Sequence, residues 1–207
     1  MLAKTKAVKK GEPLRADARL KRAQIITTAM EHYRTKPASQ VTLESIAADA
    51  GVGIATLYRH FPSRAALREA CAIGFIELLE EYLQKTVQEF DSNPEEEWET
   101  FVLTLMDYGV GMLVGALVAD LPSTDDCEME SEYEEFFQRL GELLHKAAAH
   151  KLIDPDLTPI EFATELIVVT RPMDEQFTAL FPDVRQRLVR HLLTAWRAAG
   201  AAQGAVN

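Results

Sequence analysis

The sequence predicts an all-α fold with a small helical head and a larger helical body. Apolar residues recur at the three- and four-residue spacing of amphipathic helices, and Gly or Pro interrupts each pattern. The charge divides the chain at a similar place. Residues 1–70 contain 13 Lys and Arg against six Asp and Glu, a formal charge of +7, so the remaining residues carry −17. A basic head on an acidic body is typical of proteins whose head approaches a polyanion.

The composition excludes several classes of protein. The chain has 207 residues and is 47% hydrophobic, enough for one or two domains with a substantial core. No apolar run approaches the ~20 residues of a membrane span, and no apolar stretch follows the lysine-rich start as in a secretory signal. The two cysteines, Cys71 and Cys127, have no metal or redox spacing, which favours a reducing, cytoplasmic setting.

The chain begins with a lysine-rich segment, residues 1–14, which contains Gly11 and Pro13. We expect it to be a disordered basic arm. Such an arm either contacts a nucleic acid or is only a solvated tail, and the sequence leaves both open. An amphipathic helix follows from Ala16 to about Arg34. Its predicted inward stripe is Ala23, Ile26, Met30 and Tyr33.

Residues 42–61 predict two short helices joined by a tight turn. Thr42 is a good N-cap for the first helix, and Gly51 fits the left-handed conformation that ends it. The second helix covers Ile54–Phe61, and Pro62 ends it.

The second short helix has one apolar face, formed by Ile54, Leu57 and Phe61, and the rest of its surface is small, polar or basic. This arrangement predicts a helix-turn-helix whose second helix enters the major groove of DNA. The alternative is a helical hairpin inside an all-α core. Polar side chains such as Arg59 and His60 would be unusual on a buried helix, which favours the first interpretation.

The same stretch resembles the TetR family of transcriptional regulators. The match is ungapped and comprises Ala47, Ala50, Gly51, Val52, Thr56, Leu57, Tyr58, His60, Phe61, Ser63 and Leu67. The resemblance covers roughly residues 20–70 and is consistent with a helix-turn-helix domain over 15–62, a helical ligand-binding and dimerisation domain over 63–200 and a flexible tail over 201–207. Gly53, Ala55 and Arg64 depart from the usual family residues, so the operator sequence stays open.

The predicted DNA-contacting residues are Thr42, Gly53, Ala55, Thr56, Tyr58, Arg59, His60 and Arg64. Thr42 and Arg64 lie at helix N-termini and are predicted to bind phosphate. Arg59 is the candidate for bidentate recognition of guanine. The resemblance implies backbone and base-edge contacts for Thr56, Tyr58 and His60.

The body is predicted to consist of long helices with short breaks. We expect helices over residues 63–90, 96–119, 131–150, 158–181, with a kink at Arg171–Pro172, and 183–199. The first of them passes from head to body without a break, so it can transmit motion between the two.

The helix expected over 96–119 carries an aromatic and methionine stripe and three glycines. A glycine inside a helix costs about 1 kcal/mol relative to alanine, so Gly109, Gly111 and Gly115 need a reason, such as close helix contact or space for a ligand. One hypothesis is a ligand pocket, and the alternative is an ordinary core. The predicted pocket residues are Trp98, Phe101, Leu105, Tyr108, Met112, Phe137 and Met173.

The last two helices have more apolar surface than one core needs, which predicts a homodimer, unless both faces are internal. The resemblance implies a four-helix bundle between subunits. The sequence therefore predicts a repressor that a small hydrophobic effector releases from a palindromic operator in double-stranded DNA. The alternatives are a DNA-binding dimer without an effector and a small-molecule carrier with a vestigial head. No catalytic residue, metal ligand, cofactor motif or membrane partner is predicted.

Overall fold

The computed structural model describes residues 12–118, 127–173 and 175–203. Within these ranges the chain forms α-helices and short 3-10 turns without any strand, which confirms the all-α prediction. The elements in chain order are α1 (Glu12–Thr35), η1 (Ala38–Gln40), α2 (Leu43–Asp49), α3 (Ile54–His60), α4 (Arg64–Glu89), η2 (Phe90–Ser92), α5 (Pro94–Asp107), α6 (Val110–Val118), α7 (Cys127–Ala149), α8 (Pro159–Thr170), α9 (Glu175–Leu180) and α10 (Val184–Gln203).

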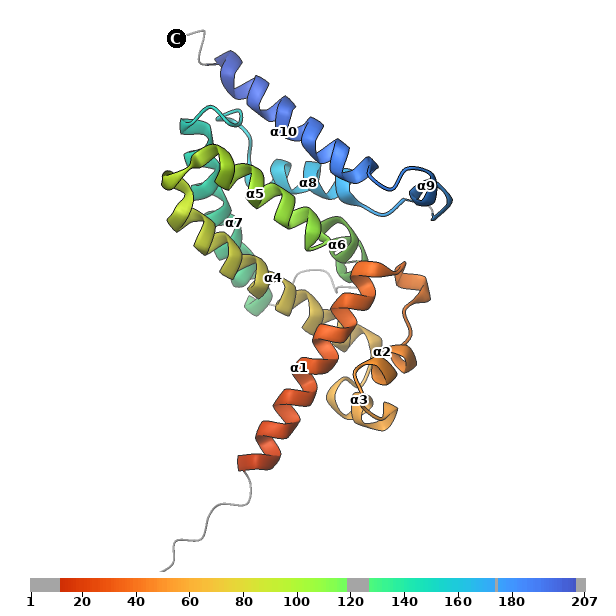
Figure 1. The fold of residues 1–207 in the computed structure, drawn as a ribbon. Helices are drawn as coiled ribbons and strands as arrows, with labels where there is room; N and C mark the ends of the chain where they lie inside the picture. Colours follow the sequence, from red (N-terminus) through yellow and green to blue (C-terminus); the bar gives the residue numbers. More distant parts are fainter. Residues whose placement is uncertain (1–11, 119–126, 174, 204–207) are drawn as a thin grey trace, which may run out of the picture.

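The head lies at one end of the molecule and contains α1, α2, α3 and the start of α4, while α10 lies at the opposite end (Figure 1). Its core is formed by fully buried side chains from each helix. These are Ile25, Ala29 and Tyr33 of α1, Ile46 of α2, Leu57 of α3, Phe61 and Leu67. Burial of these apolar side chains fixes α2 and α3 against α1.

The buried face of α1 differs from the predicted stripe. Ile25 and Ala29 point into the head core, whereas Ala23 is exposed and Ile26 and Met30 are only half-buried. The reason is that α1 contacts α4 and α6 as well as α2, so it has apolar residues on more than one face. Of the predicted stripe, Tyr33 is fully buried, Ile26 and Met30 pack at the edge of the core, and only Ala23 is exposed.

The fourth helix joins head to body. The side chain of Ser63 accepts a hydrogen bond of 3.1 Å from the Ala66 amide and caps α4. From there α4 runs for 26 residues to Glu89 and lies beside α7 (Figure 1). The predicted unbroken helix between head and body is therefore present.

The helix expected over 96–119 is two helices. Gly109 adopts φ +76° between α5 and α6, a conformation that side chains other than glycine rarely adopt. The axes of α5 and α6 differ by 46°. The prediction failed because Gly109 was interpreted as one of three glycines inside the helix rather than as the residue that ends it.

Several helices begin or end at other residues than predicted. α1 begins at Glu12, so residues 12–14 are helical, and residues 1–11 of the predicted arm lie outside the described residues. α8 stops at Thr170, before Arg171 and Pro172, and α9 is a separate short helix. α10 continues past Gly200 to Gln203, and a Cβ at Gly200 would lie 2.5 Å from the Ile153 carbonyl oxygen. Residues 204–207 lie outside the described part.

In the body, α10 packs on α5 and α8, while α4 and α7 pack together on the other side of α5 and α6 (Figure 1). None of the described helices alone has the length and hydropathy of a membrane span, although α5 and α6 together reach both across their bend. In the described ranges, no cluster of three or more His, Cys, Asp or Glu side chains is arranged to hold a metal ion.

Candidate DNA-binding surface and ligand cavity

The turn between α2 and α3 is fixed at both ends by local hydrogen bonds. Thr42 caps α2: its hydroxyl accepts from the Ser45 amide at 3.1 Å, and the Ser45 hydroxyl accepts from the Thr42 amide at 3.4 Å. At the other end Gly51 has φ +64°, and the Val52 amide donates to the Ala47 carbonyl at 2.9 Å. This is the predicted left-handed cap in its Schellman form, which sets the angle between the two helices.

A buried histidine holds α2 onto α1. His32 is 4% exposed, its Nε2 lies 2.7 Å from Asp49 Oδ2, and its Nδ1 lies 3.4 Å from Ser45 Oγ. The contact positions both ends of α2. Sequence reasoning missed His32, because its partners lie 13 and 17 residues further along the chain and no short motif marks them.

The third helix presents polar side chains outward from a buried base. Leu57 and Phe61 are buried as predicted, and the Arg22 guanidinium lies 5.2 Å from the centre of the Phe61 ring. Tyr58 is 46% exposed, and the exposed Arg59 donates from Nη2 to the Thr56 hydroxyl at 2.8 Å. This hydrogen bond holds the guanidinium along the outer face of α3.

One predicted anchor of α3 is in a different place. Ile54 was expected to face inward with Leu57, but it is 38% exposed. It is the first residue of α3, and helical side chains lean toward the N-terminus, so Ile54 extends past the turn that packs on the head. The apolar side chain therefore lies on the same surface as Tyr58.

The other predicted DNA contacts lie around α3. Gly53 and Ala55 are exposed at its start, and His60 is half-buried with its ring centre 6.4 Å from that of Phe61. Arg64, at the start of α4, donates from Nη2 to the Val41 carbonyl at 2.8 Å. Thr42 is exposed at the start of α2. The predicted residues thus occupy α3 and the N-termini of α2 and α4, on one part of the head.

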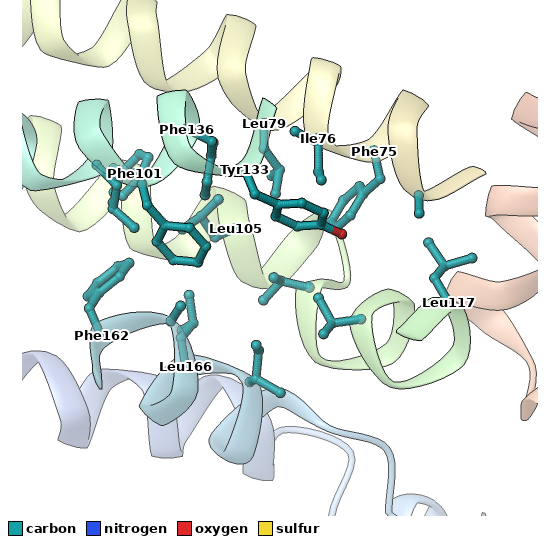
Figure 2. A pocket seen from close by; sticks show the side chains of 17 residues that line it. Phe75, Ile76, Leu79, Phe101, Leu105, Leu117, Tyr133, Phe136, Phe162 and Leu166 are labelled. Atoms are coloured by element: carbon teal, nitrogen blue, oxygen red, sulfur yellow. The ribbon is translucent and has the colours of Figure 1, made fainter. Parts of the chain in front are cut away.

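A partly open cavity of about 160 Å³ lies in the body between α4, α5, α6, α7 and α8 (Figure 2). Its lining is almost wholly apolar. The lining residues are Ala72, Phe75, Ile76, Leu79, Phe101, Leu105, Val110, Val114, Leu117, Tyr133, Phe136, Phe137, Leu140, Phe162, Ala163, Leu166 and Ile167.

The structure brings three of the seven predicted pocket residues to this cavity: Phe101, Leu105 and Phe137. Trp98 is buried beside it, in an aromatic cluster with Trp196 at 5.9 Å between ring centres. Tyr108 lies in a groove beside α1 and α4.

The remaining two, Met112 and Met173, line a separate open cleft between the head and the α8–α10 end of the body. The bend at Gly109 explains the separation, because residues after it no longer continue the face of α5. Sequence reasoning missed the contributions of α4 and α8, such as Phe75 and Ala163. The apolar faces of these helices were evident from the sequence, but the sequence did not show which apolar residues border the cavity.

The three glycines have three different surroundings. Gly109 ends α5 with a positive φ, and a Cβ there would lie 2.6 Å from Arg34 Cγ. Gly111 packs so closely on α8 that a Cβ would overlap the backbone of Thr170 and Arg171. Gly115 is exposed, and a Cβ added there would have no atom of the described residues within 4 Å. Close contact therefore explains Gly111, while none of the three lines the cavity.

Cys71 lies on α4 at the junction and is fully buried. Burial raises the pKa of its thiol to about 12, so it stays protonated and unreactive at neutral pH. This supports a packing role over oxidant sensing, the less favoured alternative.

The fold and the surface of α3 define a class of protein: a helix-turn-helix regulator with a helical body. Residues 25–71 match the family model described as "Bacterial regulatory proteins, tetR family". The match confirms the resemblance predicted from the sequence, and it covers the helix-turn-helix and the start of α4.

Two relatives match this chain over less than a third of its length. The nucleoid occlusion factor SlmA of Alteromonas mediterranea is 41% identical over 63 residues, which is 30% of each chain. SlmA of Shewanella pealeana is 43% identical over 60 residues, 29% of this chain and 27% of its own. The match therefore spans less than a third of these relatives.

Solved structures match nearly the whole chain. A TetR transcription regulatory protein from Mycobacterium vanbaalenii is 26% identical, with a TM-score of 0.58 over 89% of this chain and 99% of its own. A regulatory protein TetR from Rhodobacter sphaeroides has a TM-score of 0.62 over 87% of this chain and 98% of its own; at 16% identity it shows the fold alone. The proteins matched are regulators, in agreement with the prediction that this chain is not an enzyme.

Proposed function

We propose that this protein is a homodimeric transcriptional repressor that acts in the cytoplasm and leaves a palindromic operator when a small apolar effector binds its body. The observation that carries the proposal is the outer face of α3, where Tyr58 and Arg59 project from the basic end of the chain. Residues 1–70, which include the lysine-rich arm, have a formal charge of +7. A basic, exposed helix on a rigid base suits the major groove.

Each head residue has a proposed role. Arg59 recognises guanine through two hydrogen bonds, and Tyr58, Thr56 and His60 contact adjacent base edges and backbone. The start of α2 at Thr42 and the guanidinium of Arg64 bind phosphate. Two heads of a dimer would meet successive major grooves about 34–36 Å apart, so the operator would be palindromic.

The dimer surface is proposed on α8 and α10. Val189 and Trp196 of α10 face the core, whereas Leu188 on the same helix is 39% exposed. On α8, Ile160 and Val168 are 67% and 53% exposed and lie eight residues apart on one face. α8 and α10 pack on each other, so their exposed apolar side chains offer a surface that a second copy would cover.

The cavity favours an effector over a body that serves only for dimerisation. An apolar cavity of about 160 Å³ weakens packing, and a core without a ligand would gain by filling it. The intact surface of α3 favours a regulator over a carrier with a vestigial head.

The sixth helix is the proposed link between cavity and head. Val110, Val114 and Leu117 of α6 line the cavity. At its start Gly109 touches Arg34 of α1, and near its end the Ala116 carbonyl accepts from Arg68 Nη1 of α4 at 3.3 Å. A ligand that displaces α6 would therefore act on both helices that carry the head. A saturating ligand that left operator affinity unchanged would contradict this switch, because coupling requires different affinities for the two states.

The experiment that tests the proposal is selection of bound sequences from a random DNA pool by the purified protein at two salt concentrations. We expect a palindromic motif that persists at the higher salt. Binding that is sequence-independent and disappears with salt would mean that the head attracts phosphate without recognising bases.

A further inference from the structure

We infer that the cavity takes a neutral molecule without hydrogen-bonding groups, about the size of one aromatic ring. The inference rests on the proposed function, since it names the chemical class of the effector. Among the described lining residues no side chain carries a charge, and Tyr133 alone carries an oxygen (Figure 2). All other lining side chains are aliphatic or phenylalanine rings.

The lining excludes ionic ligands on physical grounds. A carboxylate or ammonium group moved from water into an apolar cavity loses its hydration and finds no compensating partner there. The charged side chains on two of the cavity helices, Glu80 of α4 and Arg139 of α7, form an ion pair with each other. An anion in the cavity would have to compete for Arg139 with a carboxylate already in place.

The size of the ligand follows from the volume. Apolar cavities of about 150 Å³ lined by Leu, Ile and Phe stay dry and bind benzene. The present cavity has about 160 Å³ and the same kind of lining. Phe101 and Phe162 both line it, with an interplanar angle of 17° and 6.3 Å between ring centres. These rings present aromatic surface to a ligand of one ring.

The two tryptophans of the chain provide an internal readout. Trp98 lies 5.6 Å and Trp196 5.1 Å from Phe162, measured between ring centres, and Phe162 lines the cavity. A ligand that touches Phe162 therefore changes the surroundings of both tryptophans and their fluorescence.

The test is a titration of the full-length protein with toluene, benzyl alcohol, benzoate and benzylamine, followed by calorimetry and tryptophan fluorescence. We expect toluene to bind, and benzoate and benzylamine to bind at least about 100-fold more weakly, since burial of an unpaired charge costs several kcal/mol. Benzoate or benzylamine that binds within tenfold of toluene and displaces it would overturn the inference.

Two substitutions locate the binding. Ala163→Leu on α8 fills the cavity, and Val114→Phe fills it from α6 on the other side. We expect each to weaken toluene binding at least about tenfold, because the larger side chain occupies the space that toluene would fill. Ala149→Leu adds the same side chain as the first at an exposed position on α7 and should leave binding unchanged. Unchanged affinity in a folded cavity variant, verified by thermal unfolding, would overturn the assignment to this cavity.

The tyrosine hydroxyl gives the sharpest test of polarity. Tyr133→Phe removes the only oxygen of the described lining and is expected to change toluene affinity less than about twofold. Benzyl alcohol that binds tighter than toluene and loses this advantage in Tyr133→Phe would show a ligand with a hydrogen bond and overturn the inference.

Operator binding separates this inference from the proposed function. Toluene binding without any effect on operator affinity would contradict the proposed switch and leave the ligand class intact. Release of the operator by benzoate, with no binding of toluene, would support the switch and overturn the ligand class.

Discussion

The head and the body carry their candidate sites in opposite ways. The head presents exposed side chains of one short helix, α3, on a base fixed by local caps at Thr42 and Gly51. The body encloses an apolar space between five helices, to which no single helix contributes more than a few residues. A surface site of the first kind depends on local sequence, whereas a void depends on how distant helices cross.

The largest effect on stability is expected in the body, at a glycine where α6 packs on α8. Gly111→Ala should destabilise the body by about 3 kcal/mol, because the new Cβ would overlap the backbone of Thr170 and Arg171, which cannot rotate away. Urea-induced unfolding measures the change.

The matched control is Gly115→Ala on the same helix. No atom of the described residues lies within 4 Å of a Cβ there, so alanine should stabilise the protein by up to about 1 kcal/mol. Equal effects of the two substitutions would show that contact between α6 and α8 does not constrain this helix.

The head side is tested by Arg59→Ala, which should weaken operator binding by about 1–3 kcal/mol and relax preference at one base position. Unfolding should change little, since Arg59 is exposed and bonds only to Thr56 on its own helix. Binding to a panel of single-base operator variants measures the preference. Equal discrimination by wild type and Arg59→Ala would rule out the assigned role.

Arg64→Ala sharpens this test. It should weaken binding to all sequences similarly, because a phosphate contact carries no base information. It should also lower stability, since the Arg64 guanidinium donates to the Val41 carbonyl at 2.8 Å. Arg59→Ala thus tests recognition of bases, whereas Arg64→Ala tests contact with phosphate.

The head was more predictable than the body for physical reasons. The two caps of α2 depend on residues within four positions of the helix ends, so Thr42 and Gly51 were interpreted correctly. The contact of His32 with Asp49 was not predicted, because it joins two helices.

In the body, the helices were recognised but the break at Gly109 was not, since periodicity alone does not show where a glycine adopts a positive φ. That single bend moved Met112 away from the face of Phe101 and Leu105 and so dispersed the predicted pocket. The volume left between helices depends on how they pack against each other, which the periodicity of each helix alone does not specify.

A smaller effect is expected from the two capping boxes, one in each region. Thr42→Ala in the head and Thr158→Ala in the body should each cost about 1 kcal/mol of stability, because each removes a hydrogen bond to the first turn of its helix. Only Thr42→Ala should also weaken operator binding, since it loosens α2 beneath α3. Thermal unfolding and operator titration of both variants measure the difference. Loss of operator affinity in Thr158→Ala but not in Thr42→Ala would contradict the assignment of operator binding to the head.

The smallest expected effect is a difference between the two capping boxes in how their contribution to stability depends on pH. In the body, the Thr158 hydroxyl and amide donate to Glu161 at 2.6 and 2.9 Å and lower the pKa of this carboxyl below its usual 4.5. Stability from these bonds is therefore fully present above about pH 4.5 and is lost as the pH falls through the lowered pKa. In the head, Ser45 occupies the equivalent position and its hydroxyl does not titrate.

Glu161→Gln keeps the shape of the box and removes the titration. We expect wild type to be slightly more stable than Glu161→Gln at neutral pH and the difference to vanish toward about pH 3, measured by urea unfolding at each pH. Other carboxylates titrate alike in both proteins, so their contributions cancel in the difference. A gap that stays constant into acid would mean that the charge of Glu161 adds nothing to the cap, and that both boxes stabilise their helices through neutral hydrogen bonds alone.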